Sequence, residues 1–439
     1  MKKSNVQLSQ TVLAASLLAG AAGVYAQEGA DNVAVNLQLR PRYEFASQDG
    51  KANDANAATN RTLLGITAKP FGDIGFGLQF SNVSRLGDDD FNDTANGKTT
   101  YPLVPDPDMT TVTQAYLEYA GLPDTKLRVG RQIVDLDNQR FVGKTDWRQT
   151  MSTFDAISIE NRSLGRVRLF AAYADRTNAS YANGQLPAGS NLQDVENVFL
   201  NAAADVIPGL TLTAYGYQYE DETQPAFAAS NLSSRTVGLR VNGFAGGSAE
   251  DKPVLLPTSD TTIANVSSGM RWLYTLEYAR QSDYADGRRD IDNDYYQLGA
   301  GLVTARFLVR VDNMVLGAND AATYGLQTPT ATKHPLNGWA DMFLVTPATG
   351  LNDLYLTAGY KFLGMQLIGV AHDYRADAGS AHYGSEVGAM LVRPFGKRLM
   401  GALKYAEYRA DDGEGAVFPG TANPNVDTRK AWLFATYTY

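Results

Sequence analysis

The sequence has 439 residues, a formal net charge of −9 and no cysteine. The acidic balance argues against nucleic acid as a partner, because nucleic-acid binding needs basic patches that displace counterions, and the lack of cysteine excludes disulfides and thiolate metal sites. A chain of this length with 24 tyrosines, 41 glycines and no obvious linker favours one large closed sheet over several soluble domains.

The first 26 residues have the three parts of a secretory signal in order. Lys2 and Lys3 form a positive start, residues 11–23 are apolar, and residues 24–26 resemble a cleavage site. The mature protein is therefore expected to begin at Gln27, with residues 27–439 as a single domain. No later window has 18 consecutive apolar residues, so a membrane role must use strands.

Residues 33–45 show the alternation expected of a transmembrane strand, in which one face meets lipid and the other a wet interior. Pro41 departs from the pattern because proline has no backbone N–H to donate to the neighbouring strand. We therefore expect a local bend of the strand at this position. The apolar positions are Val33, Val35, Leu37, Leu39, Tyr43 and Phe45, and the polar ones are Asn36, Gln38, Arg40, Arg42 and Glu44.

The rest of the chain repeats this plan, with short turns and long polar loops alternating between strands. This pattern predicts an all-β fold, a transmembrane antiparallel β-barrel of about 18 strands. The strands are predicted near residues 33–45, 61–70, 74–85, 110–121, 125–136, 154–161, 166–174, 195–206, 210–220, 233–243, 271–282, 294–303, 306–316, 352–361, 365–374, 383–394, 399–408 and 429–439.

The asymmetry between turns and loops predicts the topology. Bacterial barrels have short periplasmic turns and longer outer loops, so both termini are expected in the periplasm of a Gram-negative bacterium, with the barrel in its outer membrane. The final predicted strand ends on the aromatic Tyr439, which is typical of an outer-membrane assembly signal. Residues 244–269 are long for a periplasmic turn and predict either a plug-like segment or a miscounted hairpin.

Two blocks of sequence resemble the alginate-export family of outer-membrane barrels. The first contains LRVGRQ at 127–132, DNQRFVG at 137–143, WRQ at 147–149 and FDA at 154–156. The second is HPLNGWADMF at 334–343, continued by GLNDLYL at 350–356. The resemblance implies an 18-stranded monomeric barrel, narrowed by loops and lined with arginines, that passes an anionic uronate polymer outward. Because the family includes members without an assigned cargo, the resemblance supports the channel more than the substrate.

Strand parity places basic side chains on the lumenal face, because a cation facing lipid would cost roughly 2–4 kcal/mol at the midplane. Arg131 has the opposite parity and is expected near the rim or after a bulge. The predicted path for the transported molecule comprises Arg40, Arg42, Lys126, Arg128, Arg166, Arg168, Arg240, Arg306 and Arg310, with Arg140 and Arg148 from a loop.

A narrow passage with fixed cations raises the local concentration of anions. The planar fork of arginine suits carboxylates, and many weak sites allow release. The leading hypothesis is therefore a passive channel for anionic polysaccharide, in the manner of alginate-like polyuronate export. Its expected partners are outer-membrane lipid, the anionic polysaccharide or oligosaccharide, and periplasmic export proteins.

The alternative is a general or oligosaccharide-uptake porin in which acids neutralise the arginines. The loop at 137–147 has two readings as well: it is predicted to fold inward as a constriction, and the alternative is a plain surface loop. The acids that could form neutralising ladders are Glu44, Glu118, Asp155, Glu160, Glu277 and Asp312.

Chemistry of other kinds has weaker support in the sequence. The best arrangement for an outer-membrane enzyme is His372-Asp373 with Ser385, which is not a compact constellation. The Asp-rich loops could hold Ca²⁺, and the alternative is a solvated acidic surface. His372 and His382 could bind a metal, but the sequence has only three histidines and no ligand spacing. We therefore expect no catalytic residue, metal or cofactor. Trp272, Tyr274 and Tyr278 are predicted to face lipid rather than to stack on sugars.

Overall fold

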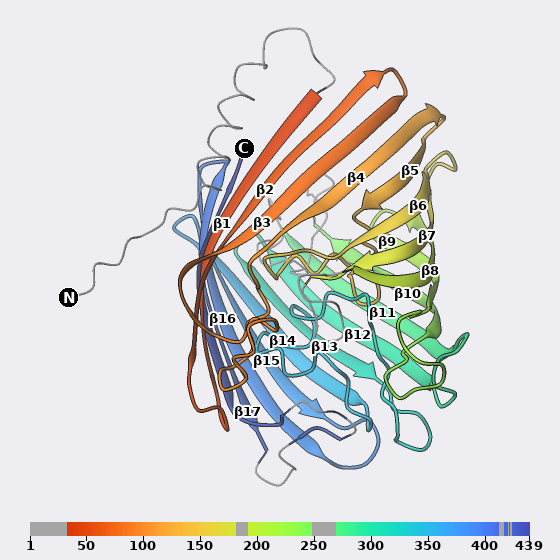
Figure 1. Ribbon diagram of the computed structural model, residues 1–439. Helices are drawn as coiled ribbons and strands as arrows, with labels where there is room; N and C mark the ends of the chain where they lie inside the picture. The colour runs from red at the N-terminus through yellow and green to blue at the C-terminus, as the bar shows by residue number, and fades with distance from the viewer. Residues whose placement is uncertain (1–32, 181–191, 248–268, 412–416, 420, 422–423) are drawn as a thin grey trace, which may run out of the picture.

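The structure is a computed structural model that describes residues 33–180, 192–247, 269–411, 417–419, 421 and 424–439 (Figure 1). The predicted signal peptide at 1–26 and most of the predicted segment at 244–269 lie outside the described residues. Where the chain is described, no helix is both long enough and apolar enough to cross a membrane.

The described chain folds as one 18-stranded antiparallel sheet, which confirms the predicted fold class and strand number. Its strands are β1 (Val33–Gln48), β2 (Ala55–Phe71), β3 (Ile74–Asp90), β4 (Met109–Leu122), β5 (Thr125–Gln132), β6 (Thr153–Asn161), β7 (Val167–Asn178), β8 (Leu192–Ile207), β9 (Leu210–Tyr219), β10 (Ser234–Gly246), β11 (Met270–Asp283), β12 (Asp292–Thr304), β13 (Phe307–Leu316), β14 (Leu351–Phe362), β15 (Met365–Arg375), β16 (His382–Phe395), β17 (Leu399–Ala410) and β18 (Thr428–Thr438).

Each strand pairs with the next along the chain, and β18 returns to pair with β1. At this closing seam Glu44 lies opposite Trp432. The ladder from β1 to β18 passes from Leu39 to Arg42 without a pair at Pro41, whereas the pairing of β1 with β2 is continuous. Proline therefore interrupts one ladder locally while the strand itself continues.

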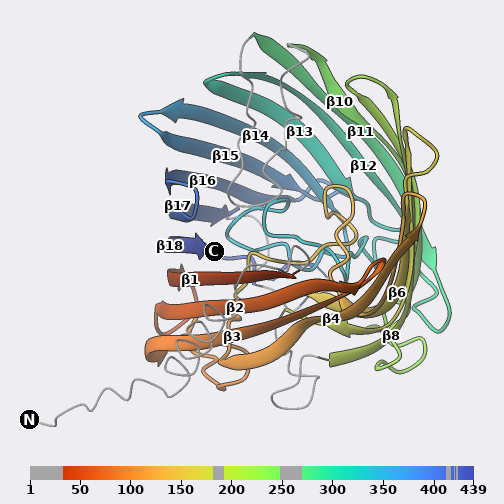
Figure 2. The ribbon, with the colours of Figure 1, turned by 90° about the horizontal axis from the view of Figure 1, so that it is seen from above.

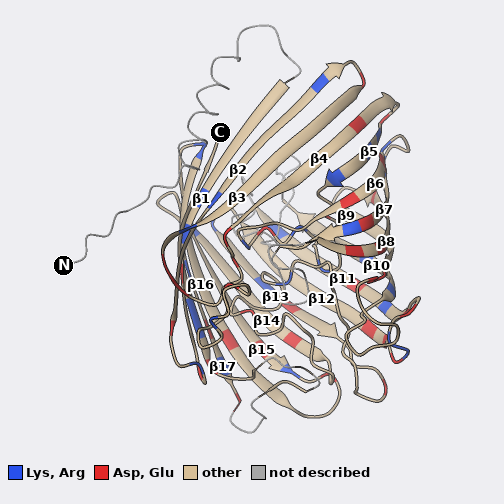
Figure 3. Ribbon diagram, in the orientation of Figure 1, with Lys and Arg blue, Asp and Glu red and all other residues tan. Residues whose placement is uncertain are grey.

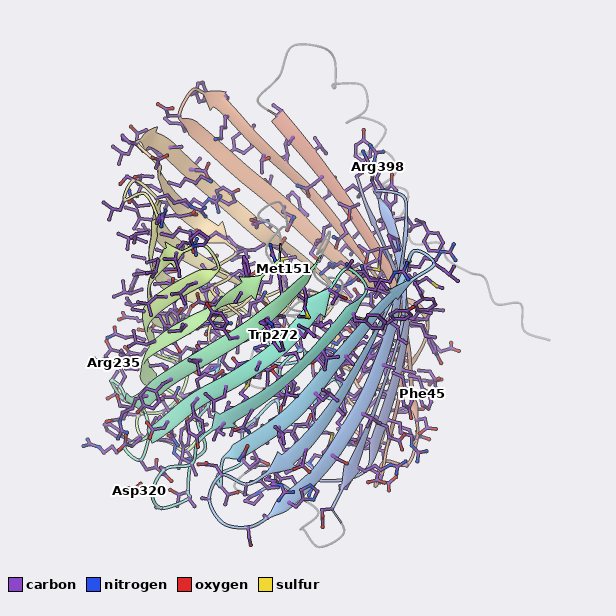
Figure 4. The ribbon with its side chains drawn as sticks, turned by 180° about the vertical axis from the view of Figure 1, so that it is seen from behind. Phe45, Met151, Arg235, Trp272, Asp320 and Arg398 are labelled. Carbon is purple, nitrogen blue, oxygen red and sulfur yellow. The ribbon has the colours of Figure 1, made fainter. Side chains whose placement is uncertain are left out.

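The alternation of side chains sets the two faces of the barrel. On β11, Trp272, Leu276 and Tyr278 are exposed on the outer face, while Thr275 and Glu277 between them are buried. Successive residues of a strand point to opposite faces, so the exposed apolar set faces lipid and the polar set faces the lumen. Figure 4 shows Trp272 on the outside of the barrel wall.

The two ends of the barrel differ. At one end, the short-turn end, consecutive strands meet in tight turns such as Leu363-Gly364, where φ is +48° and +72°, as a two-residue hairpin turn requires. At the other, the long-loop end, long connections join the strands. Arg398 lies at the short-turn end, and Arg235 and Asp320 lie at the long-loop end (Figure 4).

Several strands are longer than predicted. The loop predicted at 46–60 shrinks to residues 49–54, because β1 and β2 continue as a paired ladder in which Ala46 lies opposite Ala55. Ladder pairing uses the backbone, so strands can extend beyond the stretch in which the side chains alternate. Arg166 and Arg306, predicted to lie on strands, are instead in the turns before β7 and β13.

Candidate functional site

Two long loops fold into the barrel and fill part of its lumen (Figure 2). They are residues 133–152, between β5 and β6, and residues 317–350, between β13 and β14. The loops bind each other, since Gly143 N donates to Thr330 O at 2.9 Å and Thr332 N to Gln139 O at 3.0 Å. We call them the constriction loops. The predicted inward fold of 137–147 is confirmed, and 317–350, predicted only as an outer loop, joins it.

Arg40 on β1 anchors the first constriction loop through its backbone. Its guanidinium donates to Asp146 O at 2.9 Å, to Trp147 O at 3.2 Å and to Arg148 O at 2.5 Å, and to the side chain of Gln149 at 3.0 Å. A buried carbonyl left without a donor is costly, so one arginine satisfies three successive peptide groups. Arg40 therefore shapes the constriction more than it offers free N–H groups to a passing ligand.

Arg42 and Arg148 share a buried cluster of acids beside this anchor. Arg148 lies 2.6 Å from Asp341, 3.3 Å from Glu44 and 3.7 Å from Asp106. Arg42 pairs with Asp106 and donates to Trp147 O at 2.7 Å. The cluster joins the barrel wall, the loop before β4 and both constriction loops in one ionic network.

Lys404 on β17 extends this network into a cage of tryptophan rings. Its ammonium lies 4.0 Å from the ring centroid of Trp147 and 4.2 Å from that of Trp339, which is within the range of cation–π attraction. It also lies 2.7 Å from His334 Nε2, and His334 Nδ1 lies 2.7 Å from Asp341 Oδ1. One wall lysine thus contacts both constriction loops.

Glu386 on β16 holds the second constriction loop at Trp339-Ala340. Its carboxylate accepts from Trp339 N at 2.5 Å and from Ala340 N at 3.1 Å. The preceding residue, Gly338, has φ +92°, and a Cβ there would lie 2.1 Å from the Tyr374 hydroxyl. Glycine is needed at this position both for the backbone angle and for the close approach to the wall.

A second buried group of arginines lies among β10–β14. The pairs are Arg310 with Asp312 at 2.6 Å and Arg240 with Glu277 at 3.6 Å. Arg140, from the first constriction loop, donates to Asn337 at 2.5 Å across to the second loop. These arginines are therefore held by acids and amides of the wall and loops.

A cavity of about 370 Å³ opens beside the constriction loops. It reaches the β16–β17 turn, so it lies toward the short-turn end. The ring of Trp147 and the amides of Gln38 and Gln139 contribute to its wall. Its charged lining is predominantly basic, with Asp146 as the acid and Arg40, Arg61, Lys144, Lys397 and Arg398 as the bases. We call it the vestibule.

The charged groups of the constriction loops have shifted pKa values. Burial opposes ionisation of Asp341, but the charges of His334, Lys430 and Arg148 outweigh it and hold its pKa well below the usual value. Burial also tends to raise the pKa of Asp146, but the charges of Arg61 and Arg40 have the larger combined effect and lower it. Burial, with Arg140 nearby, lowers the pKa of Lys333 to about 8.

The remaining predicted path residues lie away from the constriction loops. Arg128 pairs with Glu118 at 2.7 Å and Arg168 with Asp205 at 2.7 Å, both partly exposed. Lys126 on β5, Arg166 and Arg306 are exposed near the short-turn end. Arg166 donates to Val206 O at 3.2 Å. The predicted set therefore divides into buried arginines that hold the constriction loops, buried arginines paired with acids of the wall (Arg240 and Arg310), and more exposed groups near one mouth.

Arg131 lies near the long-loop end of β5, at the rim, which is one of the two places predicted for it. It pairs with Asp155 at 2.6 Å and donates to Val112 O at 3.0 Å. Gly130 before it has φ +116°, a value that favours glycine. The ion pair gives this arginine a partner at the rim, where Arg176 also lies opposite Asp155 in the ladder.

The acids proposed to neutralise arginines do pair with basic residues. Each of the six has a basic partner within 4 Å, a geometry that supports the neutralising alternative at those positions. The pairs are Glu44 with Arg42 and Arg148, Glu118 with Arg128, Asp155 with Arg131, Glu160 with Arg162, Glu277 with Arg240, and Asp312 with Arg310.

The sequence analysis missed several members of the site. Strand parity could have found Lys404 and Trp432, since both alternate with outward-facing leucines at 403 and 433. Asp106, His334 and Asp341 lie in loops, where parity does not apply. Only the folded structure shows which way a loop turns.

The structure places two of the residues considered for catalysis, Asp373 and Ser385, opposite each other in the β15–β16 ladder, but it turns His372 to the other face of the sheet. His372 is buried at 2.9 Å from Asp353, whereas the neighbouring Asp373 contacts Arg375 and His382. His372 and Asp373 are adjacent on a strand and so point to opposite faces. Among residues with described positions, no group of three or more acidic or histidine side chains is arranged to hold a metal ion.

Figure 3 shows where the charged residues of the barrel lie, with Lys and Arg in blue and Asp and Glu in red. A closed antiparallel barrel with an apolar outer face, a polar lumen and inward-folded loops defines a membrane channel. The chain belongs to the alginate export family, because the sequence model described as "Alginate export" matches residues 31–306. The protein is therefore an outer-membrane channel. A comparison with curated protein sequences found no match.

Solved structures of similar fold are outer-membrane channels. OpdO of Pseudomonas aeruginosa is 14% identical, with a TM-score of 0.65 over 93% of this chain and 98% of that one. OccAB2 of Acinetobacter baumannii is 16% identical, with a TM-score of 0.66 over 94% and 99%. OpdK of Pseudomonas aeruginosa, solved with vanillate, is 12% identical, with a TM-score of 0.66 over 94% and 100%. At these identities the likeness concerns the fold.

Proposed function

We propose that this outer-membrane channel conducts anionic polysaccharide, of the polyuronate class, by passive diffusion. The vestibule carries the proposal. Its lining combines five basic residues with one acid and places the ring of Trp147 beside them. Guanidinium and ammonium groups attract carboxylates, and an aromatic ring offers a flat surface to a sugar. Family membership supports the same class of cargo.

The charges of the constriction point in the same direction. Around Trp147 the bases of the wall and loops outnumber the acids, so the ion pairs do not cancel the positive charge. The bases are Arg40, Arg42, Arg61, Arg148, Lys404 and Lys430, and the acids are Glu44, Asp106, Asp146 and Asp341.

The short-turn end is proposed to face the periplasm, because bacterial barrels have short turns on that side. The vestibule would then be a cavity that a polymer meets soon after it enters from the periplasm. Exposed Lys397 and Arg398 border both the vestibule and the short-turn mouth. Periplasmic export proteins, if they deliver polymer, would do so at this mouth.

Single-channel recording in planar bilayers tests the proposal. In a salt gradient, the reversal potential should show anion preference, and polyuronate should block the current while a neutral glucan of equal length should not. Cation preference, or equal block by the two polymers, would refute the proposal.

Variants of the vestibule sharpen this test. Lys144→Gln with Lys397→Gln should lower anion preference and shorten polyuronate blocks, because the loop-anchoring arginines stay in place. Arg162→Gln is the matched control, since Arg162 is exposed in the β6–β7 turn and pairs with Glu160. A vestibule variant that behaves like this control would show that the vestibule cations do not act on the polymer.

A general or oligosaccharide-uptake porin is the second candidate, and the paired acids favour it. If Glu277, Asp312 and Glu44 cancel their arginines, small neutral and charged sugars should pass at similar rates. Liposome swelling with glucose and glucuronate separates the candidates, because the first predicts faster entry of glucuronate.

A further inference from the structure

The outer face of the barrel carries an apolar groove across the seam where β18 closes on β1, with a volume of about 650 Å³. Compact residues of three neighbouring strands form its floor. Gly401 on β17 lies opposite Ala435 on β18 in the ladder, and Pro41 of β1 lines the groove with them. Leu403 and Leu433, two residues away on β17 and β18, are exposed, so this face meets lipid. The groove is therefore a hollow in the lipid-facing wall.

A row of apolar residues follows the groove and shows its direction. The row crosses the ladders from β16 to β3, and it spans about 24 Å because neighbouring strands are about 4.8 Å apart. Barrel strands are tilted by roughly 45°, so a row at right angles to them runs diagonally through the membrane. One extended acyl chain can lie along it. The row consists of Leu391, Leu403, Leu433, Tyr43, Ala58 and Leu86.

Arg393 lies where this groove reaches the short-turn end. It is on β16, two residues before the strand ends at Phe395, and it lies opposite Gly401 in the ladder. Val392 beside it is buried, so Arg393 points to the lipid-facing side. Its guanidinium lies 5.2 Å from the ring centroid of Phe395. A long side chain at this depth keeps its stem on the apolar wall and its charge at the water interface.

Arg393 has no acidic partner. Among the described residues no carboxylate forms an ion pair with it, and the lining of the groove contains no acid. Four arginines that also face outward, by contrast, each have a carboxylate within 4 Å: Arg280, Arg375, Arg409 and Arg429. A cation beside acyl chains is costly unless an anion compensates its charge. In a membrane, the available anion is the phosphate of a lipid headgroup.

The charge around Arg393 also selects between headgroups. The next charged residues along the chain, Lys397 and Arg398, are exposed and basic as well. A guanidinium binds a phosphate with two parallel hydrogen bonds. A zwitterionic headgroup adds an ammonium, for which the groove has no carboxylate. A phosphodiester that carries one negative charge and an uncharged alcohol therefore fits best.

We propose that this groove binds one anionic phospholipid of the phosphatidylglycerol class, with an acyl chain along the groove and its phosphate on Arg393. The guanidinium donates hydrogen bonds to the phosphate oxygens, and the headgroup reaches water at the short-turn end. The lipid lies across the two strands that close the barrel, so it adds contacts to their seam. This site goes beyond the proposed function, which concerns the lumen, and does not depend on it.

Native mass spectrometry of the full-length protein in detergent tests the site. The protein is incubated with phosphatidylglycerol, phosphatidylethanolamine or phosphatidylcholine that carry the same acyl chains. We expect one phosphatidylglycerol to be retained per barrel, and the two zwitterionic lipids to be retained about tenfold less. Equal retention of the three lipids would overturn the choice of headgroup.

Two competitors separate this lipid from other sources of phosphate. Soluble glycerol 3-phosphate lacks an acyl chain, so it should not displace phosphatidylglycerol at equal concentration. Displacement would show that the groove contributes nothing, and it would overturn the proposal. Lipid A carries its phosphates at the other surface of the outer membrane. Displacement of phosphatidylglycerol by lipid A at lower concentration would overturn the assignment to the short-turn end.

Variants place the lipid on the barrel wall. Arg393→Gln should lower the retention of phosphatidylglycerol about tenfold, because a charge-assisted hydrogen bond is lost. Ala435→Phe fills the floor of the groove and should lower retention to a similar extent. Heat-modified electrophoretic mobility reports whether each variant is folded. Wild-type retention in folded Arg393→Gln would overturn the proposal, even if Ala435→Phe fails to fold.

Ala214→Phe is the matched control for the filled groove. Ala214 lines another apolar hollow of the outer face, of about 1,000 Å³ over β6–β11. Arg280 at that hollow is paired with Asp292 at 2.5 Å and with Asp294 at 3.2 Å, so it does not need a lipid phosphate. The control should retain phosphatidylglycerol as the wild type does. Equal losses in Ala214→Phe and Ala435→Phe would mean that lipid adsorbs to the wall in general, which contradicts a site at Arg393.

Discussion

The ammonium of Lys404 lies 4.0 Å from the ring centroid of Trp147, so a lysine of the barrel wall directly holds a tryptophan of a constriction loop. Trp147 also stacks on His334 of the other loop, with ring centroids 4.3 Å apart. The wall, the first loop and the second loop thus meet at one cation. The constriction is expected to behave as one unit.

Replacing this cation should loosen both loops together. In Lys404→Met the side chain keeps its length but loses its cation–π contacts, each worth up to about 2 kcal/mol when desolvated. We expect a larger and noisier single-channel conductance, with the barrel still inserted. Lys397→Met, at the exposed short-turn end, should keep the wild-type noise, and quiet wild-type currents in Lys404→Met would contradict the expectation.

Replacement of Arg148 should lower the free energy of unfolding more than replacement of any other residue of the ionic network. Arg148→Met leaves Glu44 and Asp106 with fewer cationic partners in a buried site, and breaking a buried pair typically costs about 3–5 kcal/mol. The free energy of unfolding in urea and lipid vesicles measures this loss. The exposed pair of Arg162 with Glu160 provides the comparison, since Arg162→Met should cost about 1 kcal/mol or less. Equal losses in the two variants would argue against a network at the constriction.

Lys333 should make the channel sensitive to pH near 8. Burial and Arg140 lower its pKa from the ordinary value of 10.5 to about 8. Below pH 8 the folded protein carries the buried charge, which destabilises it. As the pH rises from 8 towards 10.5, the folded protein loses this charge while the unfolded chain still keeps it, so the destabilisation is relieved. The constriction loop should therefore gain stability, by up to about 3 kcal/mol, as pH rises through this window.

The loss of one lumenal charge should also change the permeation of ions. Anion preference in a salt gradient is expected to fall between pH 7 and pH 9 in the wild type and to stay flat in Lys333→Gln. A fall of the same size in the variant would assign the transition to another group.

The outer face of β11 gives a direct test of orientation in the membrane. Leu276→Arg places a guanidinium among acyl chains and should cost about 2–4 kcal/mol of folding free energy in lipid vesicles. Leu276→Phe keeps the position apolar and should cost much less. A small loss for arginine would mean that the position does not face lipid.

The wall of the barrel was more predictable than its lumen. Alternation along residues 33–45 fixes which side chains face inward, because a strand has only two faces, and it placed Arg40 and Arg42 correctly in the lumen. Alternation does not predict which way a side chain points in a turn, and Arg166 and Arg306 lie in turns. It also does not predict the partners of a side chain. Arg40 binds the three carbonyls of residues 146–148, which belong to a loop about a hundred residues away.

The loops were harder because their course depends on tertiary contacts. The inward fold of 137–147 was one of two readings of the sequence, and nothing in its local pattern signalled that residues 317–350 would join it. Gly338 illustrates the reason: its φ of +92° and its packing on Tyr374 follow from a wall residue distant in sequence. Local propensity cannot encode such a contact.

Leu37 and Tyr439 exchange two backbone hydrogen bonds, of 3.3 and 2.8 Å, at the seam where β1 meets the end of the chain. The cylinder is closed only once β18 is in place, because β18 supplies the ladder that pairs with β1. Until then, the partly formed sheet has two bare edges that can pair with other molecules. The route to the membrane therefore demands protection of these edges, and changes at Tyr439 should delay assembly more than they weaken the finished barrel.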